Sequence, residues 1–556
     1  MIQYIKKAVL IVIAIIASIG IQLNINMDIC IWNRFSGNYM ISLILCFFIF
    51  EALEKVSKLK DKRVHFFAGI IALVFSVIEV LGFYLENYNQ LHFVKVSIIK
   101  GIAYYICFYI AITILFSKIK KNANKAERVH REAKSQKNIK LFFGSWGVIF
   151  ICWIPYFIKY FPGIMTPDSI LQAGQAIAYG LNSHHPMFHT LIIKLALNIG
   201  NIIKDYNMGV AIYSIMQMLI MSSIFAYAIT YIDSRQTSKV FSILSLVYFA
   251  IYPVFGVYSI TMWKDILFSG IMPFFIIQNI ELIFNTEEFL GKKRNMVAYV
   301  IIAIFTILLR HNGLYVVMLS LQFTFVVLRK HWKKVLIMFL SILVIYEAFN
   351  FVVFKILKVK KGSVGELLSV PIQQIVRSVK NNYEDIDEET INKINEYFTV
   401  ENAWEYYNPV LSDPVKFKFN NGYFEENKSE FISIWLKLFV KYPKDYIEAF
   451  ISNSYGYYYP EARNSIVSRA TMDHNMGIKQ TPLIEGKWVE QIDSLTDVRD
   501  IPAFSFAFSI GAGFMLTVIA LSYIIYKKKY KYILVYLPTF ILWLTLIASP
   551  AYCEFR

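Results

Sequence analysis

The segment from residue 161 to 190 places side chains that can carry acid–base chemistry between two long apolar runs. It holds a single aspartate, Asp168, followed by Gln172, His185 and His189. An ionised carboxylate near imidazole groups is a candidate general base, because it can accept a proton from a reacting hydroxyl. We therefore treat Asp168 as the candidate catalytic residue and the other three as candidate substrate-binding residues.

Asp168 stands at a predicted helix start. Thr166 can cap a helix, Pro167 suits the first helical position, and the positive end of the helix dipole favours an acid. We expect a helix from here to about Tyr179, amphipathic and lying on the membrane surface, with Asp168 and Gln172 on one face. The dipole would keep Asp168 ionised, although helix capping alone also explains an aspartate at this position.

The histidines raise the question of a metal. We expect His185 and His189, four residues apart, to share one face of the next helix, a spacing that suits a metal ion. However, the chain has no HExxH sequence, and its five cysteines form no CxxC pair. We therefore expect no required cofactor, and a divalent metal stays an open alternative.

Polar side chains interrupt apolar surroundings elsewhere as well. Ionisable groups at membrane depth are costly, so they are candidates for function. The further candidates for substrate binding are Lys264, Asp265, Arg310, His311, Asn312, Gln374, Arg377, Glu554 and Arg556. Structural alternatives exist: a solvated span end for 264–265, a turn between two short spans for 310–313, and the polar face of an ordinary helix for 373–377.

The composition indicates a membrane protein. The 556 residues are 57% hydrophobic and 17% charged, and the mean hydropathy is +0.49. Many apolar runs reach the roughly 20 residues that a helix needs to cross a bilayer, and they lack the alternation of a barrel strand. We expect an all-α polytopic protein with about 13–14 transmembrane helices. The net charge of +17 lies in short basic loops, which indicates cytoplasmic loops, membrane lipid as a partner and no nucleic acid.

These basic loops also predict the topology. The N-terminus, with Lys6 and Lys7, lies in the cytoplasm, and the segment 161–189 lies outside. Three apolar runs between residues 190 and 257 would then leave 263–265 inside. We expect one run to be broken or re-entrant, with Tyr252-Pro253 as the break, so that 263–265 lies outside.

The chain divides into four predicted parts. A four-span module ends in a basic cytoplasmic loop, and a transmembrane catalytic core carries the first outer loop. A mainly helical extracytoplasmic domain and two C-terminal transmembrane helices follow. Their ranges are 1–140, 141–357 with the loop 161–189, 358–500 and 501–556.

The motifs "GIMTPDSILQ", "HHPMFHT", "MWKDILFS", "LRHNG", "LLSVPIQQIVR" and "YCEFR" resemble those of an uncharacterised family of bacterial polytopic proteins. This resemblance covers about residues 141–556. The arrangement of a span, an outer loop with an early aspartate, a surface helix and a His-Pro at the next span resembles GT-C type glycosyltransferases. Protein O-mannosyltransferases and the lipid A aminoarabinose transferase are examples of that type.

This resemblance implies a reaction and a location. GT-C type enzymes take a sugar from a polyprenyl-phosphate lipid and pass it to an acceptor on the outer face of the membrane. It implies that Asp168 deprotonates the acceptor hydroxyl and that cations stabilise the leaving phosphate. The candidate cations are Lys264, Arg310, His311 and Arg377. The implied partners are the lipid-linked donor and a cell-envelope glycan or protein, at the bacterial plasma membrane.

Two other functions fit the same sequence. A surface polysaccharide polymerase or ligase also combines many spans with a large outer loop, and a change in glycan chain length would identify it. A lipid or solute transporter usually carries internal repeats and charges at the bilayer midplane. The chain shows no internal repeat, and its polar groups gather toward the predicted outer face.

Overall fold

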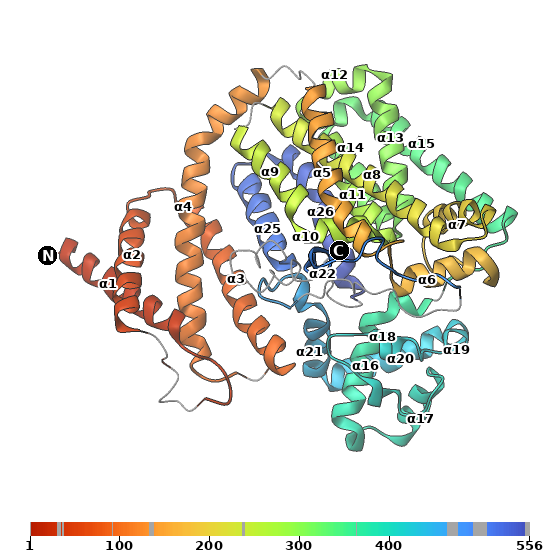
Figure 1. Ribbon diagram of the computed structural model, residues 1–556. Helices are drawn as coiled ribbons and strands as arrows, with labels where there is room; N and C mark the ends of the chain where they lie inside the picture. Colours follow the sequence, from red (N-terminus) through yellow and green to blue (C-terminus); the bar gives the residue numbers. More distant parts are fainter. Residues whose placement is uncertain are drawn as a thin grey trace.

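The computed structural model describes residues 2–29, 35, 38–91, 93–132, 138–235, 239–362, 364–463, 476–492 and 509–550. The protein is an all-α polytopic membrane protein, as predicted (Figure 1). In these ranges, β structure is limited to two strands of two residues each and three isolated bridges. The helices form an N-terminal module, a membrane core and a helical domain.

The N-terminal module consists of four helices at one side of the molecule (Figure 1). They are α1 (Ile2–Gln22), α2 (Tyr39–Ser57), α3 (Lys62–Tyr88) and α4 (Ser97–Glu132). The side chain of Asp61 caps α3 and also pairs with Lys120 at 2.7 Å. The module packs against the C-terminal helix α25 (Ile510–Tyr526), where Arg63 donates a hydrogen bond to the carbonyl oxygen of Tyr526.

The membrane core contains most of the remaining apolar helices. They are α5 (Ile139–Lys159), α7 (Met187–Ile202), α8 (Tyr206–Ser234), α9 (Lys239–Ile251), α10 (Pro253–Ser259), α11 (Lys264–Phe284), α12 (Thr286–Gly291), α13 (Lys293–Leu309), α14 (Asn312–Val327), α15 (Trp332–Phe351) and α26 (Ile533–Ala548). One apolar cluster surrounds Trp153, where α5, α8, α9 and α10 meet. A second surrounds Phe275 and Tyr299, where α11, α13, α14, α15 and α26 meet.

Eight described helices are long and apolar enough to cross a membrane, or nine if the bent pair α9–α10 counts as one span. Three further apolar helices, α7, α14 and α25, are shorter than 18 residues. The predicted number of 13–14 is larger because it also counts these three short helices and the apolar runs of α2 and α13.

The α9–α10 pair is the predicted broken run. The two helices are bent by 54° at Tyr252, and Pro253 occupies the first position of α10. Proline lacks the N–H that a continuous helix needs, which explains the break at this point. The chain then enters strand β2 (Thr261–Met262), which pairs in parallel with strand β1 (Ile164–Met165). The chain therefore leaves both strands at the same edge.

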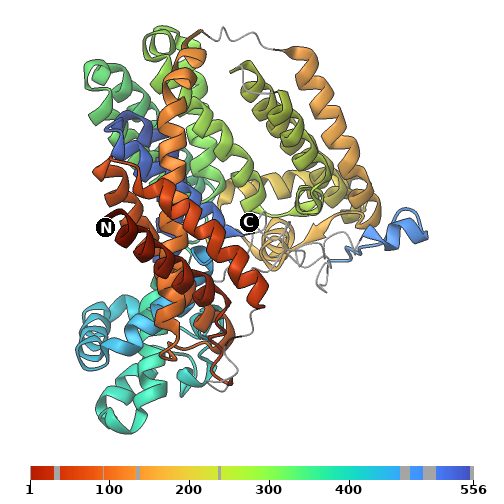
Figure 2. The ribbon, with the colours of Figure 1, turned by 90° about the vertical axis from the view of Figure 1, so that its left-hand side faces the viewer.

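The helical domain lies at one end of the membrane core (Figures 1 and 2). Its helices are α16 (Ser369–Asn382), α17 (Glu388–Glu396), α18 (Asp413–Lys416), α19 (Asn421–Glu426), α20 (Lys428–Lys441) and α21 (Pro443–Ser454). Helix α17 begins with acidic residues, and the chain breaks between α20 and α21 at Tyr442, before Pro443. The short helix α22 (Lys487–Glu490) lies against α5 instead, where Lys159 donates a hydrogen bond to the carbonyl oxygen of Val489.

Candidate functional site

Two strand-to-helix junctions lie side by side and form the centre of the candidate site. Strand β1 leads into α6 (Pro167–Gly174), and strand β2 leads into α11. The parallel register pairs Met165 with Met262, so the first turns of the two helices begin next to each other. Asp168 and Asp265 are each the second residue of their helix. Residues almost a hundred positions apart in the sequence therefore meet here.

Local sequence explains the first junction. Thr166 and Ser169 form a reciprocal capping box, with Pro167 in the first helical position. The predicted helix start is thus confirmed, and a π-helical turn continues α6 from Gln175 to Tyr179. Helix α6 buries Gln172 completely, whereas the side chain of Leu171 is exposed. Gln172 therefore points into the protein, while Leu171 faces outward.

Asp168 is held by the second junction. Its Oδ2 accepts a hydrogen bond of 3.0 Å from the indole nitrogen of Trp263 and forms an ion pair with the Lys264 ammonium. The Asp168 side chain keeps 31% of its surface exposed. Burial raises the pKa of this carboxyl group, but the charge of Lys264 and the two hydrogen bonds outweigh that effect and lower it overall. Asp168 is therefore ionised at physiological pH.

Asp265 pairs with a different cation. Its carboxylate is fully buried and lies 3.0 Å from Arg310, whose guanidinium also stacks over the ring of Phe268. Arg310 has an extended backbone between α13 and α14. The turn that follows requires Gly313, because a Cβ atom there would lie 2.0 Å from the carbonyl oxygen of Thr306. The turn formed by the "RHNG" sequence thus places Arg310 next to the first turn of α11.

A buried hydrogen-bond network fixes α6 to its neighbours. The two ring nitrogens of His189 lie 3.0 Å from Gln172 Oε1 and 2.7 Å from the hydroxyl of Tyr213. Tyr213 donates to Gln217, whose amide donates to the carbonyl oxygens of residues 258, 259 and 261. Tyr213 and Gln217 were not predicted, although an amide inside an apolar span is a recognisable signal. This network ties α6, α7 and α8 to strand β2.

The position of His185 relative to α7 differs from the prediction. Helix α7 begins at Met187 after Pro186, so His185 precedes the helix and does not share a face with His189. It is buried, its ring contacts that of His184, and its Nε2 has no hydrogen-bond partner among the described residues. Burial and the charge of Lys264 lower the pKa of His185 to about 3. The part of the chain described contains no group of three or more His, Cys, Asp or Glu residues that could hold a metal ion.

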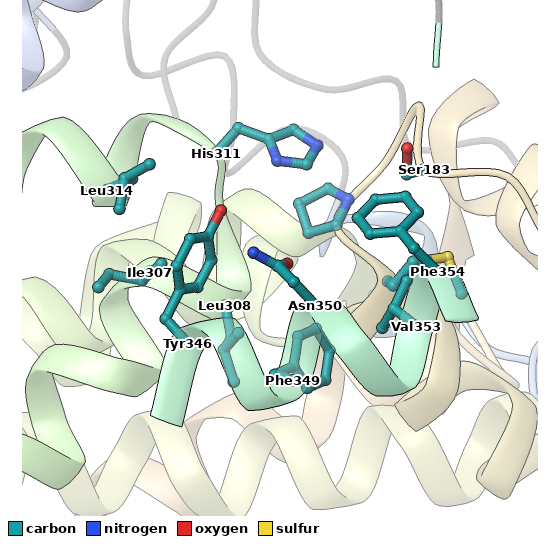
Figure 3. A pocket seen from close by; sticks show the side chains of 12 residues that line it. Ser183, Ile307, Leu308, His311, Leu314, Tyr346, Phe349, Asn350, Val353 and Phe354 are labelled. Atoms are coloured by element: carbon teal, nitrogen blue, oxygen red, sulfur yellow. The ribbon is translucent and has the colours of Figure 1, made fainter. Parts of the chain in front are cut away.

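His311 forms the edge of the site toward α15. Partial desolvation and the positive charge of Lys264 lower the pKa of its imidazole below the ordinary value. The ring faces the backbone of residues 183–184, which is fixed by hydrogen bonds between 181–183 and 360–362. A cavity of about 190 Å³ lies beneath His311 (Figure 3).

The other predicted residues lie elsewhere. Asn312 donates a hydrogen bond of 2.9 Å to Thr545 on α26. Gln374 and Arg377 are buried on α16 inside the helical domain, and none of their hydrogen-bond or ion-pair partners belongs to α6 or α11. Glu554 and Arg556 fall outside the described residues.

The fold and the site define a multi-spanning membrane protein with a buried acid–base cluster at one end of its core. A family described as "Family of unknown function (DUF6020)" matches residues 176–554, more than half of the chain, and the chain belongs to this family. The match includes Lys264, Asp265 and Arg310 and begins after Asp168. No curated protein and no solved structure matches the chain.

Proposed function

We propose that this protein is a glycosyltransferase of the bacterial plasma membrane. It moves a sugar from a polyprenyl-phosphate donor to a cell-envelope acceptor on the outer face, with Asp168 as the general base. The observation that carries the proposal is the contact between the Asp168 carboxylate and the Lys264 ammonium at the two adjoining helix starts. One group suits proton removal, and the other suits a phosphate that gains negative charge.

The reaction assigns a separate role to each group. Asp168 accepts the proton of the acceptor hydroxyl, and that oxygen attacks the anomeric carbon of the donor sugar. The bond between this carbon and the phosphate oxygen breaks, and polyprenyl phosphate leaves with the electron pair beside Lys264. Arg310 compensates the charge of Asp265 in the same first turn of α11.

The surroundings of α6 favour a donor that resides in the membrane. Leu171 is 57% exposed and Ile177 36% exposed, next to a site whose polar groups face inward. An amphiphile with an apolar chain and an anionic phosphate matches this arrangement, because its chain can stay in lipid while its phosphate reaches Lys264.

The test compares surface glycans by mass spectrometry in a strain that lacks the gene. The strain is complemented with the wild type, Asp168→Asn or Asp205→Asn at equal protein levels. Asp205 is the control, because it is an aspartate at the start of another helix, α8, away from α6 and α11. We expect a sugar to be absent with Asp168→Asn and present with Asp205→Asn and the wild type.

Full glycan restoration by Asp168→Asn would leave Asp168 only a structural role at the start of α6 and refute the proposal. A change in glycan chain length, with every sugar still present, would instead indicate a polymerase or ligase.

A further inference from the structure

The cavity beneath His311 has one polar wall and one apolar wall. Helices α13, α14 and α15, the π-helical turn at Val352–Ile356 and the loop before α7 enclose it. Figure 3 shows His311, Tyr346, Asn350 and Ser183 around one part of the space, with aliphatic and phenyl groups around the rest. A ligand that fits this cavity has both hydrogen-bonding and apolar surfaces.

Two of these polar groups have no partner within the described chain. The Tyr346 hydroxyl and the Asn350 amide lie one turn apart on α15, and Figure 3 shows both directed toward the space below His311. Polar groups on a membrane-spanning helix are costly when they make no hydrogen bond. An alkyl or isoprenoid chain in the cavity would leave them unpaired, so the occupant supplies hydroxyl groups or their equivalent.

The occupant carries no charge within the cavity. None of the described residues that line the cavity is a Lys, Arg, Asp or Glu, and the lowered pKa of His311 makes that ring neutral at physiological pH. The rings of Tyr346, Phe349 and Phe354 also line the space. A neutral pyranose combines hydroxyl edges with apolar C–H faces that pack against aromatic rings.

The cavity adjoins the charged site. His311 directly follows Arg310, and the charge of Lys264 acts on its imidazole. Pro186, which lines the cavity, directly follows the buried His185. A phosphate beside Lys264 would therefore have an uncharged, hydroxyl-binding space next to it, which matches the two halves of a glycosyl phosphate.

Resting on the proposed function, we propose that this cavity binds the transferred sugar and that the sugar is an uncharged hexose. Tyr346 and Asn350 are its specificity-determining residues, and they hydrogen-bond its hydroxyl groups. Sugars that bear a carboxylate are disfavoured, because no cation lines the cavity to pair with them.

The test measures binding to the full-length protein in lipid nanodiscs. The probes are farnesyl phosphate and its esters with glucose, galactose, mannose and glucuronic acid. We expect at least one neutral hexose ester to bind about tenfold or more tightly than farnesyl phosphate, and we call this difference the gain in affinity. The glucuronic acid ester should show no gain. Tyr346→Phe and Asn350→Leu should each reduce the gain by roughly two- to tenfold, the usual value of a neutral hydrogen bond.

Two controls separate specificity from loss of fold. Tyr315→Phe makes the same change at an exposed position of α14 and should leave the gain intact. Both cavity variants should bind farnesyl phosphate as the wild type does. Equal binding of all probes, or a gain that neither cavity variant reduces, would overturn the inference. Both results are independent of the Asp168→Asn glycan test, so the two proposals fail separately.

Discussion

Two clusters of charged side chains, one at the start of α11 and one on α16, differ in how they are built. On α16, the Arg377 guanidinium donates a hydrogen bond of 3.1 Å to Tyr407, forms an ion pair with Glu448 and lies 3.7 Å from Asp445. These partners belong to α21 and to the short segment before α18, within one helical domain. The cluster joins helices that already share an apolar core.

The cluster at α11 is built differently. Its members come from two strand-to-helix junctions, the turn between α13 and α14, and the loop before α7. Asp168 is partly exposed, the neighbouring Nε2 of His185 has no partner among the described residues, and a cavity lies alongside. In the α16 cluster all partners lie within one domain, which favours a structural role. In the α11 cluster a polar group remains without a partner among the described residues, which favours a role in binding a ligand.

The largest expected effect is a loss of stability when the α16 cluster is broken. Replacing Arg377 by methionine removes the buried partner of Glu448 and leaves its carboxylate only the exposed Lys444, 3.8 Å away. We expect the free energy of unfolding to fall by about 3–5 kcal/mol, as measured by denaturant unfolding in detergent micelles. Lys444→Met, at an exposed position of α21, is the control and should change it by less than about 1 kcal/mol. Equal stability of Arg377→Met and the control would contradict the structural role.

The second prediction concerns the site cluster. We expect Lys264→Met to lower glycan transfer by about 10²–10³-fold, because the leaving phosphate loses its cation. Stability should change little, since the Asp168 carboxylate is partly exposed and can be hydrated. Lys292→Met, which breaks an exposed pair with Glu288, is the matched control for both measurements. Normal surface glycans with Lys264→Met would show that this lysine only supports the fold.

The third prediction uses pH. The folded state holds His185 neutral with a pKa of about 3, whereas the unfolded chain binds a proton near pH 6.5. Stability is therefore complete above about pH 6.5 and declines as the pH falls toward 3. Between pH 7 and pH 5 we expect the loss of stability to be about 2 kcal/mol smaller in His185→Gln than in the wild type, because only the contribution of His185 is removed. A histidine in the turn before α15 provides the control, His331→Gln, which should retain the wild-type pH dependence.

Local features of the fold could be predicted from the sequence. The start of α6 follows from Thr166 and Pro167, and the break before α10 follows from Pro253. These signals act within a few residues, through capping hydrogen bonds and the missing proline N–H. The paired strands could not be predicted, because two residues per strand give no periodic pattern and pair across a long stretch of sequence.

The composition of the site was only partly predictable for the same reason. Asp168 and Lys264 are both candidate site residues from the sequence, but their contact depends on the pairing of β1 with β2. Gln374 and Arg377 show the converse case. A polar helix face indicates that its side chains have partners, but the sequence does not show whether these belong to a substrate or to neighbouring helices. Here the neighbouring helices supply them, through Trp435, Tyr446 and Glu448.

The smallest expected effect tests Asn312, which lies one residue from His311. Its amide donates to Thr545 and joins α14 to α26, so Asn312→Ala should lower stability by only about 0.6–1.7 kcal/mol, the usual range for a hydrogen bond between membrane helices. In a double-mutant cycle with Thr545→Val, the second substitution should add little once the first is present. Surface glycans should be unchanged in all three variants. Glycan loss with Asn312→Ala but not with Thr545→Val would assign Asn312 to the substrate site and extend the α11 cluster to the first turn of α14.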